Sequence, residues 1–236
     1  LRKTISRELP AKKFKAKKVV SVIQSSSILI RNVILDKQTD KIIKEILDVK
    51  LEEYMPIEKS QYQVDYKVLR EFEDEGIEKY ELSLVAAPNS IVLPLASLLK
   101  SLKLVPILIN IGSEAIGNVF TGPKRLMFDS SDGVLVLDIG GMSTNATIVA
   151  GSNAVLSRYI DFGVSHIHQA FEEAERNSSI LDKPSEKEEN IEKIRPLIEY
   201  NIISEVERIL QFYYSNLNLG AIKKVYIIGG GAGIKG

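Results

Sequence analysis

Short runs of apolar and β-branched residues alternate with stretches that carry an apolar stripe at helical spacing, and this pattern predicts a mixed α/β fold. The runs predict strands near residues 18–24, 27–35, 62–70, 80–87, 104–111, 134–138, 144–150, 154–161 and 224–228. Helices are predicted from Thr39 or Asp40, from Asn89 or Ser90 to Lys103, over 164–176, and from Glu188 or Pro196 to Asn216. The apolar face of the first helix is predicted to be Ile42, Ile43, Ile46 and Leu47.

The order of these elements predicts two parts with different tasks. Residues 20–103 form a β-β-α-β-β-α string with its own apolar faces, which predicts a small module. Residues 129–236 contain two glycine-rich turns and are predicted to form a nucleotide-binding lobe. A chain of 236 residues with 44% hydrophobic content can bury one sizeable core or two modest ones. The acidic stretch Glu71–Glu75 is expected to be an exposed loop or helix end.

Charge and composition exclude several classes of function. The formal net charge is zero, so the chain has no general attraction to nucleic acid, and we interpret the basic residues within 1–18 as solvated charges. The absence of cysteine excludes disulfides and thiolate metal sites. His166 and His168 project from different sides of a helix, which argues against a metal pair. The apolar stretch Ile91–Ile111 is interrupted by lysines and prolines, whereas a membrane helix needs roughly 20 uninterrupted apolar residues.

The first glycine-rich turn follows a strand that is apolar on both faces. That strand, Val134–Leu137, leads directly into Asp138, which we expect to hold Mg²⁺ through water, because Mg²⁺ keeps several waters and takes few protein carboxylates. Glycines without a Cβ atom let backbone N–H groups close on a phosphate, and hydroxyl side chains add donors. The residues assigned to these roles are Gly140, Gly141, Ser143 and Thr144.

Taken alone, this first motif is more often an ordinary hairpin turn, so a second signal is needed. Further along the chain, the apolar strand Val225–Ile228 runs into Gly229, Gly230 and Gly231. So apolar a strand is expected in the centre of its sheet, and the three glycines are expected to give the adenosine half of a nucleotide access to bare backbone. Together, the two clusters favour a nucleotide site over a simple turn.

Four blocks of the second half carry a resemblance to a known family. They are Asp138–Thr144, Ser157–Gly163, Phe212–Ser215 and Ile227–Gly236. In this order they resemble the actin-like ATPase superfamily, most closely the type IV pilus assembly PilM family, with the FtsA cell-division family as its nearest relative. The apolar blocks of the first half occur in the PilM order as well.

The resemblance implies an α/β actin-like ATPase fold with ribonuclease H-like lobes and a small inserted α+β domain. Residues 1–19 and 104–128 would belong to the first lobe, 20–103 to the inserted domain, and 129–236 to an incomplete second lobe. An earlier Asp-x-Gly phosphate loop and a helix after the last turn, both typical of the family, are missing from the sequence. Both ends are therefore expected to lie inside a longer protein, and this chain is expected to bind ATP·Mg²⁺ weakly or not at all. The family's Glu-Lys pair near adenosine is incomplete, since Ser178 replaces the lysine beside Glu175.

The resemblance also implies a function. The chain would be a cytoplasmic ATP-binding scaffold of the type IV pilus inner-membrane platform, at most a weak ATPase, that binds the cytoplasmic amino-terminal peptide of PilN and other platform proteins. The membrane would be reached only through these partners, and nucleic acid is not expected as a partner. One alternative is an FtsA-like cell-division actin homologue. Another is a sugar- or acetate-kinase-type phosphotransferase, which needs a catalytic carboxylate. Glu114 is the only acidic residue between Leu82 and Asp129, and it is explained equally well as a residue in the first turn of a helix.

Overall fold

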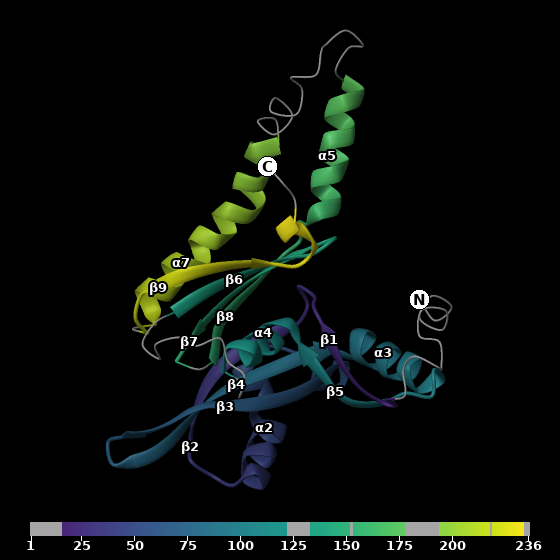
Figure 1. Ribbon diagram of the computed structural model, residues 1–236. Helices are drawn as coiled ribbons and strands as arrows, with labels where there is room; N and C mark the ends of the chain where they lie inside the picture. Colours follow the sequence, from purple (N-terminus) through teal and green to yellow (C-terminus); the bar gives the residue numbers. More distant parts are fainter. Residues whose placement is uncertain (1–15, 122–132, 152, 178–193, 218, 234–236) are drawn as a thin grey trace. The chain divides into compact units, whose positions relative to one another are not determined.

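The structure is a computed structural model that describes residues 16–121, 133–151, 153–177, 194–217 and 219–233 (Figure 1). The chain divides into two compact units, with the boundary between Asn110 and Ile111. Each unit has its own sheet and its own hydrophobic core. In the described part of the chain, no helix combines the length and apolar character that a membrane crossing requires.

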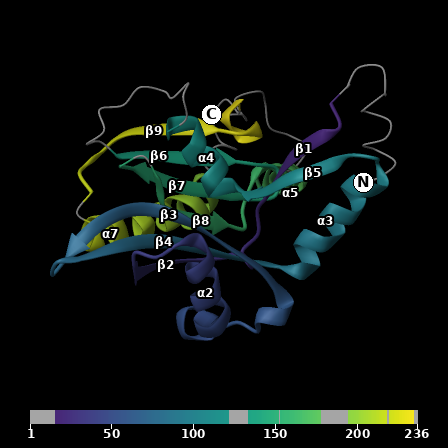
Figure 2. The same ribbon diagram turned by 90° about the horizontal axis from the view of Figure 1, so that it is seen from below.

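The first unit contains the predicted β-β-α-β-β-α string. Its elements are β1 (Lys18–Ile23), β2 (Leu29–Asp36), α2 (Asp40–Tyr54), β3 (Tyr62–Asp74), β4 (Ile77–Pro88), α3 (Asn89–Ser101) and β5 (Val105–Ile111). An antiparallel sheet has the order β2-β4-β3, with α2 against one face, and β5 pairs with β1 in a separate two-stranded sheet (Figures 1 and 2). The predicted strands and helices of this half are confirmed, with boundaries shifted by a few residues.

Helix α2 covers its sheet with a stripe at helical spacing. Ile43, Leu47 and Leu51 are buried and belong to the same core as Leu82 of β4. These positions are four residues apart, so they lie on one face of the helix. Ile42 is predicted on this face but is 39% exposed, because the buried residues follow one narrow stripe along the helix from Ile43 to Leu51.

The expectation that Glu71–Glu75 is a loop or helix end is wrong for most of this stretch. Strand β3 continues to Asp74, and the chain then turns through Glu75 and Gly76, whose φ angles are +50° and +80°. Two positive φ angles in succession are typical of the tight turns that join antiparallel strands. The acidic side chains are balanced by cations across the hairpin, as in the 2.7 Å ion pair of Lys79 with Asp74. The acidic composition suggested a loop because these partners lie on the other strand.

The second unit is built on a four-stranded sheet with helices on both faces. Its elements are α4 (Gly112–Thr121), β6 (Gly133–Ile139), β7 (Thr144–Ala150), β8 (Asn153–Ile160), α5 (Val164–Asn177), a π-helical turn η2 (Glu199–Ile203), α7 (Ser204–Asn216), β9 (Ile222–Ile228) and a short turn of helix η3 (Gly230–Gly233). The strand order is β8-β7-β6-β9, and β6 and β9 run parallel while the other neighbours are antiparallel. Helix α4 contacts β7 and β8, so the segment that we grouped with the first lobe packs on this sheet. The three-part domain division itself stays a prediction.

Strand β6 is buried on both faces, as its apolar sequence predicted. Leu135 and Leu137 belong to the core that also contains buried residues of α5 and α7. Val134 and Val136 belong to a smaller core with Phe120 of α4. Such burial on both faces explains why this strand shows no polar alternation.

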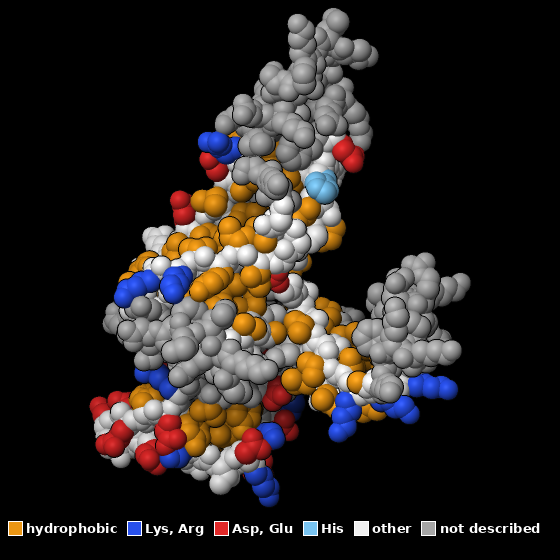
Figure 3. Space-filling view, viewed as in Figure 1, with side chains coloured by type: hydrophobic (Ala, Val, Ile, Leu, Met, Phe, Trp, Pro, Cys, Tyr) orange, Lys and Arg blue, Asp and Glu red, His pale blue; other side chains and the backbone are white. Residues whose placement is uncertain are grey.

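The prediction that Val225–Ile228 runs in the centre of the sheet is wrong for the described residues, where β9 is the outer strand beside β6. Val225 and Ile227 are 58% and 56% exposed, whereas Tyr226 packs on Phe120 with ring centroids 5.5 Å apart. Figure 3 shows hydrophobic side chains gathered on the surface over β9 and α7. Apolar composition therefore did not determine the position of this strand, because only one of its faces is packed.

Tyr213 connects the end of α7 to the beginning of β9. Its side chain is fully buried, and the single hydrogen of its hydroxyl is shared between the carbonyls of Leu219 at 2.9 Å and Gly220 at 3.1 Å. Burial raises the pKa of this tyrosine, so the hydroxyl keeps its proton. This buried hydroxyl, together with the Tyr214 hydroxyl that accepts the N–H of Ile222 at 3.1 Å, holds the chain where it enters β9.

We expect Tyr213→Phe to lower the free energy of unfolding by about 1–2 kcal/mol, because two carbonyl groups lose their donor while the ring stays packed. Denaturant unfolding followed by circular dichroism measures this change. The control is Tyr200→Phe, whose side chain is 79% exposed and should change stability by less than about 0.5 kcal/mol. Equal losses in the two variants would contradict this account.

Candidate functional site

Asp138 lies at the carboxyl end of β6, between its two neighbouring strands. It pairs in register with Asn145 of β7 and with Ile228 of β9, and it is half-buried. The chain then reverses through a tight turn that is closed by a 2.9 Å hydrogen bond from the N–H of Gly140 to the carbonyl of Ser143. The strand and the turn together place one carboxylate beside an exposed loop of backbone.

The two glycine clusters meet at this edge of the sheet. Because β6 and β9 are parallel, their carboxyl ends lie side by side. A Cβ atom on Gly229 would lie 2.5 Å from Oδ1 of Asp138, and one on Gly231 would lie 2.3 Å from Cγ2 of Ile139. Gly229 also has a φ of +85°, which side chains disfavour. Both glycines are thus needed for the close approach of the turn to β6.

Gly230 and Gly141 differ from these neighbours in the space around them. A Cβ atom on Gly230 would meet nothing within 4 Å, and one on Gly141 would meet only Oγ of Ser165 at 4.0 Å. The backbone at these two positions is therefore open to a ligand. We expected all of the glycines to provide such access, but the structure divides them into those that permit packing and those that face open space.

A third segment, Asp161–Gly163, completes the cluster of turns. A Cβ atom on Gly163 would lie 2.6 Å from the carbonyl oxygen of Gly140 and from the N atom of Ser143. The first residues of α5 bond to the same hairpin, since Val164 N–H donates to the carbonyl of Gly140 at 3.0 Å. This block formed part of the family resemblance, but we assigned it no role. A glycine directly after a strand and before a helix was the signal in the sequence.

The hydroxyl of Thr144 is bonded to the protein itself and not directed at a ligand. Its side chain is fully buried, and its hydroxyl donates to the carbonyl of Phe162 at 2.7 Å. A hydroxyl has one hydrogen, so Thr144 cannot donate to a phosphate while it keeps this bond. Its role is to hold the 161–163 segment against the hairpin, and Ser143, which is half-buried, is the remaining hydroxyl of the pair.

The residues around Asp138 fit a magnesium ion held mainly by water and phosphate. Among the residues that the structure describes, no group of three or more His, Cys, Asp or Glu side chains is arranged to hold a metal. His166 stacks on Phe162 with centroids 5.3 Å apart, and its Nδ1 accepts the N–H of Gly163 at 3.1 Å. A single carboxylate beside open backbone suits Mg²⁺, which takes few protein ligands, better than it suits a closed metal cage.

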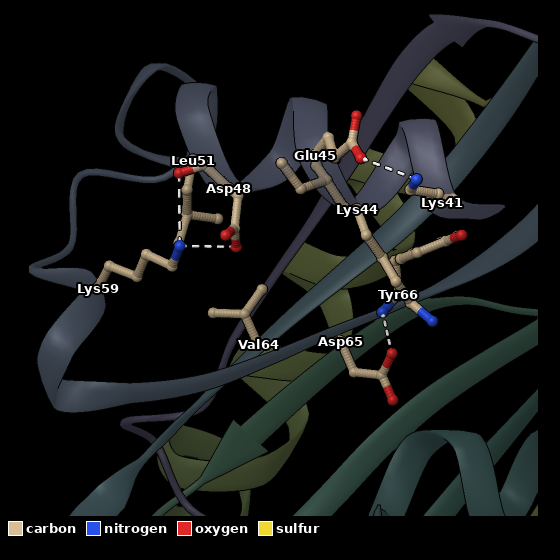
Figure 4. Close-up of a pocket in the computed structure, with 10 residues that line it drawn as sticks. Lys41, Lys44, Glu45, Asp48, Leu51, Lys59, Val64, Asp65 and Tyr66 are labelled. Atoms are coloured by element: carbon tan, nitrogen blue, oxygen red, sulfur yellow. Dashed lines mark hydrogen bonds and ion pairs between the residues drawn. The ribbon is translucent and has the colours of Figure 1, made fainter. Parts of the chain in front are cut away.

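The first unit contains a cavity of about 390 Å³ between α2 and β3 (Figure 4). Its charged groups pair with one another, as Lys59 does with Asp48 at 2.6 Å. Burial, and then a 2.5 Å hydrogen bond to Asp40, raise the pKa of Tyr66 to about 12. These mutual pairs leave little unbalanced charge for a ligand. A second cavity of about 350 Å³ lies in the second unit between the end of β8 and the start of α7.

Comparison with solved structures shows that this is an actin-like ATPase fold. The chain matches the structure of a PilM–PilN type IV pilus biogenesis complex with a TM-score of 0.79 and 21% identity, over 100% of this chain and 69% of that one. MreB5 of Spiroplasma citri bound to AMPPNP matches with a TM-score of 0.41 and 15% identity, over 62% and 54% of the two chains. EutJ from Carboxydothermus hydrogenoformans matches with a TM-score of 0.39 and 17% identity, over 58% and 47%.

The family follows from the sequence comparison. The family model for type IV pilus assembly protein PilM matches residues 1–236, and the chain belongs to this family. No curated protein matches the chain. The predicted fold class and family are thereby confirmed.

We expect Gly229→Ala to lower the free energy of unfolding by about 2 kcal/mol or more, because the added carbon both collides with Asp138 and Ile139 and requires a positive φ. Gly230→Ala is the matched control, since it adds the same carbon in open space one residue later. Denaturant unfolding of both variants measures the difference. If Gly230→Ala destabilised the protein as much as Gly229→Ala, the division of the glycines into two kinds would be wrong.

Proposed function

We propose that this chain is a nucleotide-dependent scaffold of the type IV pilus assembly machinery, with ATP·Mg²⁺ bound at the edge of the sheet where Asp138 lies. The observation that carries the proposal is the meeting of three segments far apart in the sequence. They are the hairpin 138–144, the segment 161–163 and the turn 229–233. Exposed backbone at the carboxyl ends of parallel strands is where α/β folds bind nucleotides.

Each residue of the site has a role in this proposal. Asp138 holds Mg²⁺ through water, and the bound ion would neutralise charge on the phosphates. Open backbone at Gly141 and the hydroxyl of Ser143 face the phosphates, while open backbone at Gly230 faces the adenosine half. Gly140 and Thr144, with Gly229 and Gly231, form the frame that keeps the turns together.

The arrangement favours binding over catalysis. Glu114, which a phosphotransferase could use as its carboxylate, lies in the first turn of α4, where an acidic residue stabilises the helix. Helix α4 packs on β7 and β8 and so serves the core of the second unit. We therefore propose a weak ATPase at most, in which the bound nucleotide alters the affinity for a partner.

The partner that we propose is the cytoplasmic amino-terminal peptide of PilN, together with other proteins of the pilus platform. Membership of the PilM family and the PilN complex of the matched structure support this assignment. The protein would then work in the cytoplasm, at the inner face of the membrane, through these partners. The family match over the whole chain supports this role over that of an FtsA-like division protein.

We expect Gly230→Val to weaken ATP·Mg²⁺ binding at least tenfold without lowering thermal stability, because the side chain enters space that only a ligand would occupy. Calorimetric titration and ligand-induced thermal shifts at millimolar ATP·Mg²⁺ measure the two effects. Gly230→Ala should have an intermediate affinity. If the unmodified protein showed no thermal shift at these concentrations, or if Gly230→Val bound as tightly, the proposed site would be wrong.

Asp138→Asn should reduce the Mg²⁺-dependent part of ATP affinity while it leaves the shape of the site unchanged. An amide cannot hold the water shell of Mg²⁺ by charge, so ATP binding measured with and without Mg²⁺ should become more alike. Asp161→Asn removes an exposed carboxylate from the neighbouring segment and serves as the control. An unchanged response to Mg²⁺ in Asp138→Asn would show that Asp138 is a structural residue of the turn.

A further inference from the structure

The cavity of about 350 Å³ in the second unit lies where a helix flanks an outer strand. One wall is the end of β8, from Arg158 to Phe162, and the other is the π-helical turn η2 with the first turns of α7. In the described sheet β8 is outermost, with β7 on one side and no strand on the other. A groove between a helix and an unpaired strand edge is the usual setting in which a protein adds a peptide as an extra strand.

Two guanidinium groups of this groove share one carboxylate. Glu205 accepts from Nε of Arg158 at 2.8 Å with one oxygen and from Arg208 with the other. Asp161 also lines the groove, so its four charged side chains balance overall, but Glu205 is the carboxylate that both guanidinium groups use. Arg158 and Arg208 are 56% and 69% exposed, and each guanidinium has five N–H donors, so donors remain for a second carboxylate.

The rest of the groove suits an extended chain better than a small anion. Tyr200, on the π-helical turn, is 79% exposed, and Tyr159 of β8 is half-buried. The Tyr200 ring offers flat apolar surface on the helix wall of the cavity. Irregular turns of the π type occur frequently at functional sites, since they present side chains that a regular helix would turn away.

We propose that this groove binds an extended peptide segment of a protein partner, which pairs with the free edge of β8 and places an acidic side chain on Arg158 and Arg208. Backbone pairing provides most of the affinity, and the arginine pair provides the preference for an acidic residue. The site consists of residues of the second unit. It is therefore different from the inserted domain, near which the PilN peptide is expected to lie.

The groove is directly connected to the nucleotide site through the backbone. Asp161 and Phe162 line the cavity, and the carbonyl of Phe162 accepts the hydroxyl of Thr144 from the hairpin. A peptide that fixes the end of β8 therefore acts on the segment that packs against Gly140 and Ser143. We infer that peptide and nucleotide alter each other's affinity by the same factor, as linkage requires. Only this coupling depends on the proposed function.

The test uses a fluorescein-labelled octapeptide of alternating valine and threonine with two aspartates, titrated in an anisotropy assay. We expect the double variant Arg158→Gln with Arg208→Gln to bind it at least tenfold more weakly. Arg70→Gln should bind within twofold of the unmodified protein. It is a matched control, because Arg70 is 60% exposed and pairs with Glu81 in the same way that Arg158 pairs with Glu205. Glu205→Gln should bind more tightly, a gain that loss of folding cannot produce.

Two altered peptides test the mode of binding. A peptide with lysines in place of the aspartates should bind at least tenfold more weakly, and so should one with a central proline, which cannot pair as a strand. No binding of the acidic peptide up to about 1 mM, which corresponds to roughly −4 kcal/mol, would overturn the proposal. Equal binding of the acidic and proline peptides would overturn strand addition, and unchanged affinity in Glu205→Gln would overturn the role of the arginine pair.

The same peptide separates this inference from the proposed function. Added ATP·Mg²⁺ should change its affinity in the unmodified protein, and the change should be smaller in Gly230→Val. If the peptide binds as described but nucleotide does not bind at all, the docking groove stands and the proposed nucleotide site fails. If ATP·Mg²⁺ binds but the peptide affinity stays the same, the inferred coupling is wrong.

Discussion

The close packing of three turns at the carboxyl end of β6 is the constraint on which the second unit depends. Gly163, Gly229 and Gly231 lie so near to other backbone or side-chain atoms that a single added carbon would collide. This closeness lets the 161–163 segment and the turn after β9 both contact one hairpin, although they come from distant parts of the sequence. The site is positioned by the close approach of backbone segments, to which the bond from the Thr144 side chain to the carbonyl of Phe162 adds a side-chain contact.

The fold could be predicted from the sequence where a hydrophobic pattern is compatible with only one arrangement of the chain. Strand β6 is apolar at every position, and burial on both faces is the arrangement that matches such a run. Strand β9 shows the limit of this inference, because its apolar residues face a packed helix on one side and remain exposed on the other. The hairpin of β3 and β4 shows the opposite error. Its acidic end predicts a loop, since partners such as Lys79 come into contact only when the strands are paired.

The candidate site could be predicted in part, for a similar reason. The sequence indicated that both glycine clusters belong to one nucleotide site, and the parallel pair of β6 and β9 brings them to one edge of the sheet. It could not indicate which glycines face open space, because the difference between Gly229 and Gly230 depends on atoms of β6 far away in the chain. It also could not indicate that the hydroxyl of Thr144 is bonded to Phe162, since a residue type does not reveal its partner.

The frame of Gly140, Thr144, Gly229 and Gly231 borders open space on one side and the end of β8 on the other. On one side, the backbone at Gly141 and Gly230 faces open space, where we propose that the nucleotide binds. On the other, the segment that closes the frame is the continuation of β8, whose last residues line the second cavity. A rigid frame transmits small displacements, because packed backbone cannot absorb them by changing a rotamer. The bond from Thr144 to Phe162 is the shortest described connection between the hairpin and that segment. In our proposal, a nucleotide on one side and a peptide on the other act on each other through these backbone atoms, and this lobe would report the state of the nucleotide to a bound partner.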